Sequence, residues 1–215
     1  MTGLLKHGLC SSGFLALCLF ASQANAALFS SFTSTDTPIS IPDYNQGAGT
    51  NYSSITVSDA NLSSITDINV KLNFTSSDIH DIYCYLTFQP TGSGTISVVL
   101  MNQISPSNFG WSSLSVWLDD SATTSIQTAT SVTDNGSYNP NGTLANYNGF
   151  DPNGTWRLYF SDMATGDTST LNSWTLDITA VPEPSTWAMG VFGVCFAGFG
   201  VARSFRRWQS SKRSA

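Results

Sequence analysis

The sequence predicts an all-β protein whose middle section folds as a jelly-roll-like β-sandwich of about eight strands. Apolar and polar residues alternate repeatedly between residues 27 and 180, and no sustained helical periodicity occurs there. Asn-Gly and Pro-Thr-Gly turn signals separate the alternating runs. Each end of the chain carries an apolar stretch instead, so we expect an N-terminal signal helix and a C-terminal transmembrane helix.

The clearest predicted strand covers residues 67–74. Ile68, Val70, Leu72 and Phe74 face one way there, and the residues between them are polar or charged, as in a half-buried strand. The same alternation predicts further strands at residues 82–88, 96–100, 114–118, 156–160 and 174–178, with weaker candidates at 39–41 and 54–57.

Three large or reactive side chains are predicted to lie in the core. Cys84 falls on the apolar side of its strand, so we interpret it as a small hydrophobe rather than a reactive thiol. Trp156 and Trp174 begin inward-facing rows and are interpreted as core anchors rather than sugar-stacking platforms, whereas Trp111 and Trp117 could be exposed. Because Cys84 is the single cysteine of residues 27–180, no disulfide can form within this section.

The charge of the middle section is strongly negative. Residues 27–180 contain thirteen aspartates against Lys71 and Arg157, which gives a formal charge of −11. Such a surface repels nucleic acid and anionic lipid headgroups. It suits Ca²⁺, and we hypothesise a structural Ca²⁺ site drawn from residues at predicted strand ends and turns, although aspartates also stabilise turns without metal. The candidate ligands are Asp81, Asp119, Asp120 and Asp162.

No catalytic machinery is predicted. After removal of a signal peptide His80 is the one histidine left before residue 181, and no Gly-x-Ser-x-Gly motif accompanies it. A zinc site would lack ligands, because one histidine and one buried cysteine are available. We therefore expect a protein that is not an enzyme.

The N-terminal residues 1–26 have the features of a signal peptide. Lys6 and His7 provide a basic start, an apolar stretch covers residues 13–21, and Ala24-Asn25-Ala26 offers a small-residue cleavage site. We expect cleavage after Ala26 and export of the chain. A lasting N-terminal anchor is the alternative.

The C-terminal residues 181–215 contain three consecutive features. Pro182, Glu183 and Pro184 precede an apolar run at residues 186–202, which is followed by Arg203, Arg206 and Arg207. As a helix these 17 residues would span about 25 Å, the lower limit for crossing a bilayer, and the basic cluster would remain cytoplasmic.

This order of Pro-Glu-Pro, short span and basic end resembles the PEP-CTERM sorting segment of Gram-negative, exopolysaccharide-producing bacteria. The resemblance implies that an exosortase, a membrane cysteine transpeptidase, recognises Pro182, Glu183 and Pro184. Removal of the helix would convert an inner-membrane-anchored precursor into a protein of the cell surface or extracellular matrix. A plain tail anchor with a proline-rich stalk is the alternative.

The middle section is similar to the P-domain of proprotein convertases. The resemblance is carried by residues 148–158, which read Asn-Gly-Phe-Asp-Pro-Asn-Gly-Thr-Trp-Arg-Leu, by Ser161-Asp162 and Gly166-Asp167-Thr168, and by residues 170–176; upstream, residues 65–70, 79–82 and 118–122 agree. Ser169 and His80 depart from it where glycine is usual. The resemblance implies a jelly roll of the kind that accompanies subtilisin-like serine proteases and can bind Ca²⁺ in bacterial relatives, but the protease motifs themselves are missing.

Two functions follow as expectations. The first is a non-catalytic surface or matrix protein that is processed by an exosortase and associates with exopolysaccharide or a protein partner. The alternative is an accessory P-domain module for a separately encoded subtilisin-like endopeptidase. A free-standing hydrolase ranks last.

Overall fold

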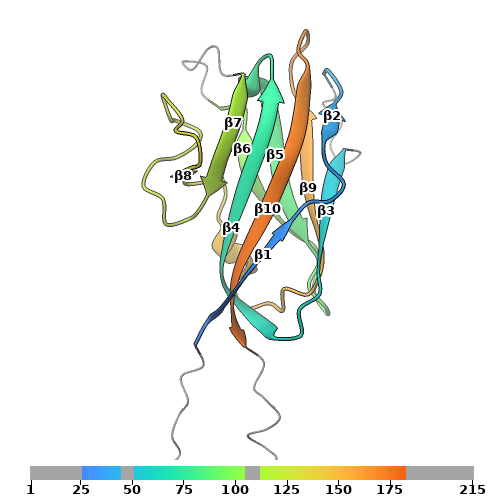
Figure 1. Cartoon of the computed structure of the whole chain (residues 1–215), viewed down its shortest axis with the longest axis vertical. Coiled ribbons are helices and arrows are strands. Elements are labelled where there is room, and N and C mark those ends of the chain that lie inside the picture. The colour runs from blue at the N-terminus through green and yellow to red at the C-terminus, as the bar shows by residue number, and fades with distance from the viewer. Residues whose placement is uncertain (1–25, 45–50, 105–111, 183–215) are drawn as a thin grey trace, which may run out of the picture.

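The computed structural model describes residues 26–44, 51–104 and 112–182, which form a sandwich of two packed sheets (Figure 1). Sheet A has the strand order β1-β10-β4-β7-β8, with β2 also pairing with β10, and sheet B has the order β3-β9-β5-β6. The strands are β1 (Leu28–Thr33), β2 (Ile39–Ile41), β3 (Tyr52–Val57), β4 (Leu62–Ser76), β5 (Ile82–Phe88), β6 (Ile96–Asn102), β7 (Ser113–Leu118), β8 (Gly136–Tyr138), β9 (Gly154–Asp162) and β10 (Ser169–Pro182). The described helices are two short 3₁₀ turns, η1 (Ile79–Asp81) and η2 (Leu144–Tyr147).

The all-β prediction is confirmed, and each of the eight predicted segments lies in a strand. Two strands were not predicted. In β1 the apolar Leu28 and Phe29 are adjacent and exposed, so the strand forms by pairing with β10 rather than by alternating burial. The three-residue β8 reads Gly-Ser-Tyr and has one large apolar side chain, so it shows no alternation.

Several finer predictions are not tested by the described residues. The jelly-roll assignment stays a prediction, and the signal helix and the helix at residues 186–202 lie outside the described residues. Within the part of the chain that the structure describes, no helix is long and apolar enough to span a bilayer.

The core lies between the two sheets and follows the alternation of the sequence. In β4 the side chains of Val70, Leu72 and Phe74 are fully buried, whereas the residues between them are half-exposed on the outer face of sheet A. Strand β10 pairs with β1 and β2 on one side and with β4 on the other, so it lies inside sheet A. Burial of these apolar rows stabilises the sandwich by roughly 25 cal/mol per Å² removed from water.

Both predicted tryptophan anchors are buried. The ring of Trp156 stacks on Phe88 with centroids 4.0 Å apart, and its Nε1 donates to the Pro152 carbonyl at 2.9 Å. The Nε1 of Trp174 donates to the Ser53 hydroxyl at 2.7 Å. Each indole therefore keeps a hydrogen-bond partner in the core, which avoids the cost of an unpaired buried donor.

Cys84 is fully buried, as predicted, and burial raises the pKa of its thiol to about 12. Trp117, by contrast, is half-exposed on the outer face of sheet A, where the Lys71 ammonium lies 5.6 Å from its ring centroid. Trp111 lies outside the described residues.

The described domain begins and ends at the same pole of the sandwich (Figure 1). Leu28 of β1 pairs with Ala180, and Pro182 at the end of β10 pairs with Leu62 at the start of β4. The β4–β5 and β9–β10 connections lie at the opposite pole, where Ser76 pairs with Ser169. This arrangement places Asp81 and Asp162 at the pole opposite the predicted sorting segment.

Candidate functional site

Three aspartates converge where the β4–β5 and β9–β10 connections meet. Strand pairing brings these connections together, because Ile82 pairs with Asp162 in sheet B and Ser76 pairs with Ser169 in sheet A. Asp78, Asp81 and Asp167 each offer a carboxylate oxygen there, and these oxygens all lie within 4.8 Å of one another. We refer to these three residues as the acidic centre.

Local hydrogen bonds fix the first of the two connections. Asp78 caps η1 by accepting from the His80 backbone N–H at 3.0 Å, and the His80 Nδ1–H donates to the same carboxylate at 2.5 Å. A further hydrogen bond runs from the Asp78 N–H to the Ser76 hydroxyl at 3.0 Å. The tight 3₁₀ turn that follows places Asp81 beside Asp78.

Ser77 ties the second connection to the first. Its hydroxyl donates to the Asp167 carboxylate at 2.8 Å and accepts from the Thr168 N–H at 2.9 Å. Its own backbone N–H donates to the Thr168 carbonyl at 3.0 Å. The acidic centre is therefore held by two loops that are bonded to each other.

The electrostatics of the acidic centre favour a bound cation. Burial raises the pKa of Asp81, and repulsion from Asp78 and Asp167 raises it further. Asp162 lies beneath them, fully buried, and burial raises the pKa of its carboxyl while a hydrogen bond from the Ala164 N–H at 3.2 Å lowers it. Three clustered carboxylate oxygens suit a hard cation such as Ca²⁺ better than Zn²⁺, which prefers nitrogen and sulfur.

Asp119 and Asp120 do not belong to the acidic centre. They follow β7, whose Leu118 pairs with Val70, and Val70 lies six positions before Ser76 along β4, a distance of roughly 20 Å. Asp119 accepts from the Ser121 N–H at 2.7 Å. Asp120 caps η2 by accepting from the N–H groups of Leu144 at 3.0 Å and Ala145 at 2.8 Å. These two carboxylates stabilise turns, the alternative role that the sequence left open.

The structure thus separates the four predicted ligands: Asp81 belongs to the acidic centre, Asp162 is a buried charged neighbour of Asp81, and Asp119 and Asp120 lie elsewhere. It also adds Asp78 and Asp167, which the sequence did not single out as ligands. One signal was available for Asp78, because it stands directly before Ile79-His80-Asp81 in the position of a helix cap. The contribution of Asp167 depends on strand pairing and has no local signal.

The predicted sorting segment begins where the described domain ends. Pro182 is the last residue of β10, and the preceding Val181 carbonyl accepts from the Ser63 hydroxyl at 3.0 Å. The other predicted features of this segment lie outside the described residues, namely Glu183, Pro184, residues 186–202, Arg203, Arg206 and Arg207. No linker therefore separates Pro182 from the sheet.

Residues 180–207 match the PEP-CTERM protein-sorting motif. The predicted sorting segment is thereby confirmed, and the motif indicates an exported protein that is sorted to the cell envelope through an exosortase. The first three matched residues are also the last three of β10.

Two Aeromonas sobria structures are among the solved structures that are similar to this chain. The crystal structure of Aeromonas sobria serine protease in complex with its chaperone shares 18% identity at a TM-score of 0.42, covering 73% of this chain and 27% of that chain. The crystal structure of the Aeromonas sobria serine protease shares 17% identity at a TM-score of 0.40, covering 72% and 27%. This chain thus spans about a quarter of each matched chain. A comparison with curated proteins finds no match.

Proposed function

We propose that this chain is a non-catalytic surface protein whose tail an exosortase removes and whose β-sandwich then associates with exopolysaccharide outside the cell. The observation that carries the proposal is the overlap of the sorting motif with the end of β10. Because the described domain ends at Pro182, processing after this residue would release a complete sandwich with every strand retained.

Two epitopes test the processing step in a bacterium that produces the protein. One is inserted in the exposed turn between β5 and β6, after Ser93, and the other follows Arg207. We expect the first epitope at the cell surface and the second to be lost from the mature protein. Glu183→Ala should block this loss, whereas the neighbouring Ser185→Ala should not. Retention of the second epitope on the mature surface protein would refute the proposal.

Association with exopolysaccharide is tested separately, by fractionating the same cells. The mature protein should sediment with the secreted polysaccharide and return to the soluble fraction when polysaccharide synthesis is deleted. A mature protein that stays with the outer membrane in both strains would contradict this part of the proposal and leave the sorting step intact.

Several features support a non-catalytic role. His80 is 7% exposed and its Nδ1 is engaged by Asp78, which suits a turn-stabilising histidine. Cys84 is buried with a raised thiol pKa, so little thiolate would form at neutral pH. The purified chain should not hydrolyse casein, and a casein-hydrolysing activity that His80→Ala abolished would overturn this expectation.

We further propose that the acidic centre holds a structural Ca²⁺. Asp78, Asp81 and Asp167 would supply the carboxylate oxygens, and the cation would offset the mutual repulsion that raises the pKa of Asp81. Isothermal titration of the chelator-treated chain with Ca²⁺ should show one binding event, which Asp81→Asn removes and Asp134→Asn, an exposed aspartate in a distant turn, retains.

The alternative function is that of an accessory module for a separate serine protease. It is favoured by the P-domain resemblance of residues 148–176 in the sequence. Affinity purification of the surface protein from its own cells would distinguish the two functions, because a stoichiometric serine endopeptidase would support the accessory role and co-purified polysaccharide the first.

A further inference from the structure

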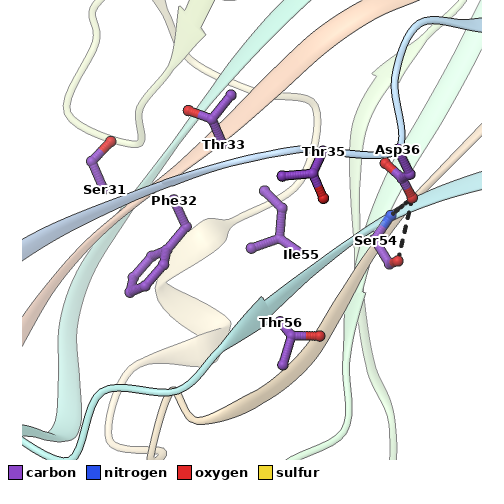
Figure 2. Close-up of a pocket in the computed structure, with 8 residues that line it drawn as sticks. All are labelled: Ser31, Phe32, Thr33, Thr35, Asp36, Ser54, Ile55 and Thr56. Carbon is purple, nitrogen blue, oxygen red and sulfur yellow. Dashed lines mark hydrogen bonds between the residues drawn. The ribbon is translucent and has the colours of Figure 1, made fainter.

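A cavity of about 480 Å³ opens between β1 and β3, at the edge where the two sheets approach each other (Figure 2). These are the edge strands of sheet A and sheet B, and the segment between β1 and β2 closes one end of the cavity. The volume lies within the range of small-molecule sites, roughly 300 to 1,000 Å³. The acidic centre contributes no residue to the lining.

Hydroxyl groups dominate the cavity wall. Five of the eight lining residues carry one, namely Ser31, Thr33, Thr35, Ser54 and Thr56. Those of Ser31 and Thr33 are bonded to Asp177 and Thr175 on β10, but those of Thr35 and Thr56 form no hydrogen bond with another described residue. A hydroxyl both donates and accepts, so this wall matches a ligand whose own groups do the same.

The one charged group of the wall is held rigidly. Asp36 accepts from the Ser54 N–H at 2.8 Å and from the Ser54 hydroxyl at 3.3 Å, as the dashed lines in Figure 2 show. Its other oxygen accepts from the buried Ser53 hydroxyl, which in turn accepts from the Trp174 indole at 2.7 Å. The carboxylate is thus fixed through a hydrogen-bond chain that reaches the core, and a ligand would meet a preorganised acceptor.

An apolar floor completes the site. The ring of Phe32 and the side chain of Ile55 lie between the strands in Figure 2. No lining residue is basic, so a phosphate, sulfate or carboxylate ligand would meet Asp36 without a countercharge. Hydroxyls, a fixed acceptor and an apolar patch together suit a sugar ring, which has hydroxyl edges and a C–H face.

The surface beside the cavity carries a row of tyrosine rings, which combine an apolar face with a hydroxyl group. Tyr52, 44% exposed, shares the outer face of β3 with Ser54 and begins a row of rings that crosses sheet B. Its centroid lies 5.3 Å from that of Tyr159, which stacks on Tyr85 at 4.9 Å. Arg157 lies over Tyr52, and residues 52–54, 83–85 and 157–159 contain no carboxylate. The formal charge of −11 over residues 27–180 nevertheless disfavours an anionic chain of sugars relative to an uncharged one.

We propose that the cavity between β1 and β3 binds an uncharged sugar residue of a polysaccharide, whose next residues continue over the row that begins at Tyr52. This inference deepens the proposed association with exopolysaccharide and rests on it for the source of the ligand. Thr35, Thr56 and Asp36 form the hydrogen bonds, and Phe32 packs against the C–H face of the ring.

The test uses the full chain in detergent and two probes from the producing cells, the neutral and the anionic fractions of secreted polysaccharide separated by anion exchange. Binding is measured by isothermal titration. Thr56→Arg fills the cavity, and Thr155→Arg is the matched control, because Thr155 pairs directly with Thr56, is also exposed and does not line the cavity. Circular dichroism confirms that both variants fold.

We expect the wild-type chain and Thr155→Arg to bind the neutral fraction equally, and Thr56→Arg to bind it roughly tenfold more weakly or worse. Equal binding by Thr56→Arg, binding of the anionic fraction alone, or no binding of the neutral fraction would each overturn the inference. If Thr56→Arg binds normally while the protein still sediments with polysaccharide in cells, the cavity inference fails and the proposed function stands. If the wild-type protein does not sediment with polysaccharide in cells but binds the neutral fraction at the cavity in vitro, the proposed function fails and the cavity inference stands.

Discussion

The acidic centre and the turn that follows β7 both contain several aspartates, and the partners of these aspartates differ. Asp120 accepts hydrogen bonds from two backbone N–H groups and Asp119 from one, so backbone dipoles stabilise both carboxylates. At the acidic centre Asp81 instead faces Asp78 and Asp167, and its pKa is raised. The comparison teaches that an acid-rich composition says little about metal binding until the partner of each carboxylate is known.

The largest expected effect comes from Ca²⁺ itself. At a concentration of about 100 times its Kd, Ca²⁺ should raise the free energy of unfolding by about 2.7 kcal/mol, because it binds the folded state alone. Asp81→Asn should abolish this response and Asp119→Asn should keep it. Thermal melts with Ca²⁺ and with chelator measure both. A melting temperature that neither Ca²⁺ nor chelator changes would show that the acidic centre does not bind Ca²⁺.

Removal of a turn-stabilising carboxylate should cost stability whether or not Ca²⁺ is present. Asp120→Ala leaves the N–H groups of Leu144 and Ala145 without their acceptor, and we expect a loss of about 1 to 2 kcal/mol in urea denaturation. Asp134→Ala, an exposed control, should change stability by less than about 0.5 kcal/mol. An equal, small effect of both substitutions would mean that η2 does not need its cap.

Acid should act on the acidic centre in opposite directions with and without metal. The pKa values of Asp81 and Asp162 are raised in the folded state above the ordinary 3.8, so the folded state binds protons more tightly than the unfolded chain. Without Ca²⁺, their contribution to stability should therefore rise as the pH falls from 7 through the folded-state pKa values towards 3.8. With Ca²⁺, protons compete with the cation and the same change should reduce the stabilisation.

The difference between wild type and Asp81→Asn isolates this contribution from the rest of the protein. Urea midpoints at a series of pH values in chelator should show a smaller acid-side gain in the variant than in the wild type. Parallel curves for the two proteins would show that the pKa of Asp81 is not raised in the folded state.

The smallest effect is expected at Asp119. Asp119→Asn keeps a side-chain oxygen that can accept from the Ser121 N–H, so stability should change by less than about 0.5 kcal/mol at neutral pH. Urea denaturation measures it. A loss as large as that of Asp120→Ala would show that the charge of Asp119, and not its hydrogen bond, stabilises the turn.

The strands could be predicted because the alternation within each segment shows which of its side chains face the core. Residues 67–74 form the middle of β4 and residues 174–178 the middle of β10, with the inward side chains as expected. β1 is an exception, because it has two adjacent exposed apolar residues and forms through its pairing with the distant β10. The buried tryptophans were predictable for the same reason.

The acidic centre could be predicted only in part, because it depends on which connections share a pole. Asp81 and Asp167 are 86 positions apart, and they meet because β5 pairs with β9 while β4 pairs with β10. Nothing in the local sequence distinguishes Asp81 from Asp120, and both stand beside the end of a predicted strand. The cavity has the same origin, since its walls come from edge strands of different sheets.

The pairing of Pro182 has a mechanical consequence. A force applied at this residue acts along β10, whose ladder with β4 extends from Ser169 to Pro182 and whose other edge is bonded to β1 and β2. Because ladder hydrogen bonds run across the strands, a lengthwise pull loads many of them together in shear instead of opening them one by one. If the protein is attached through this end, hydrodynamic drag would pull along the strands of sheet A, which is the direction in which the sheet resists force best.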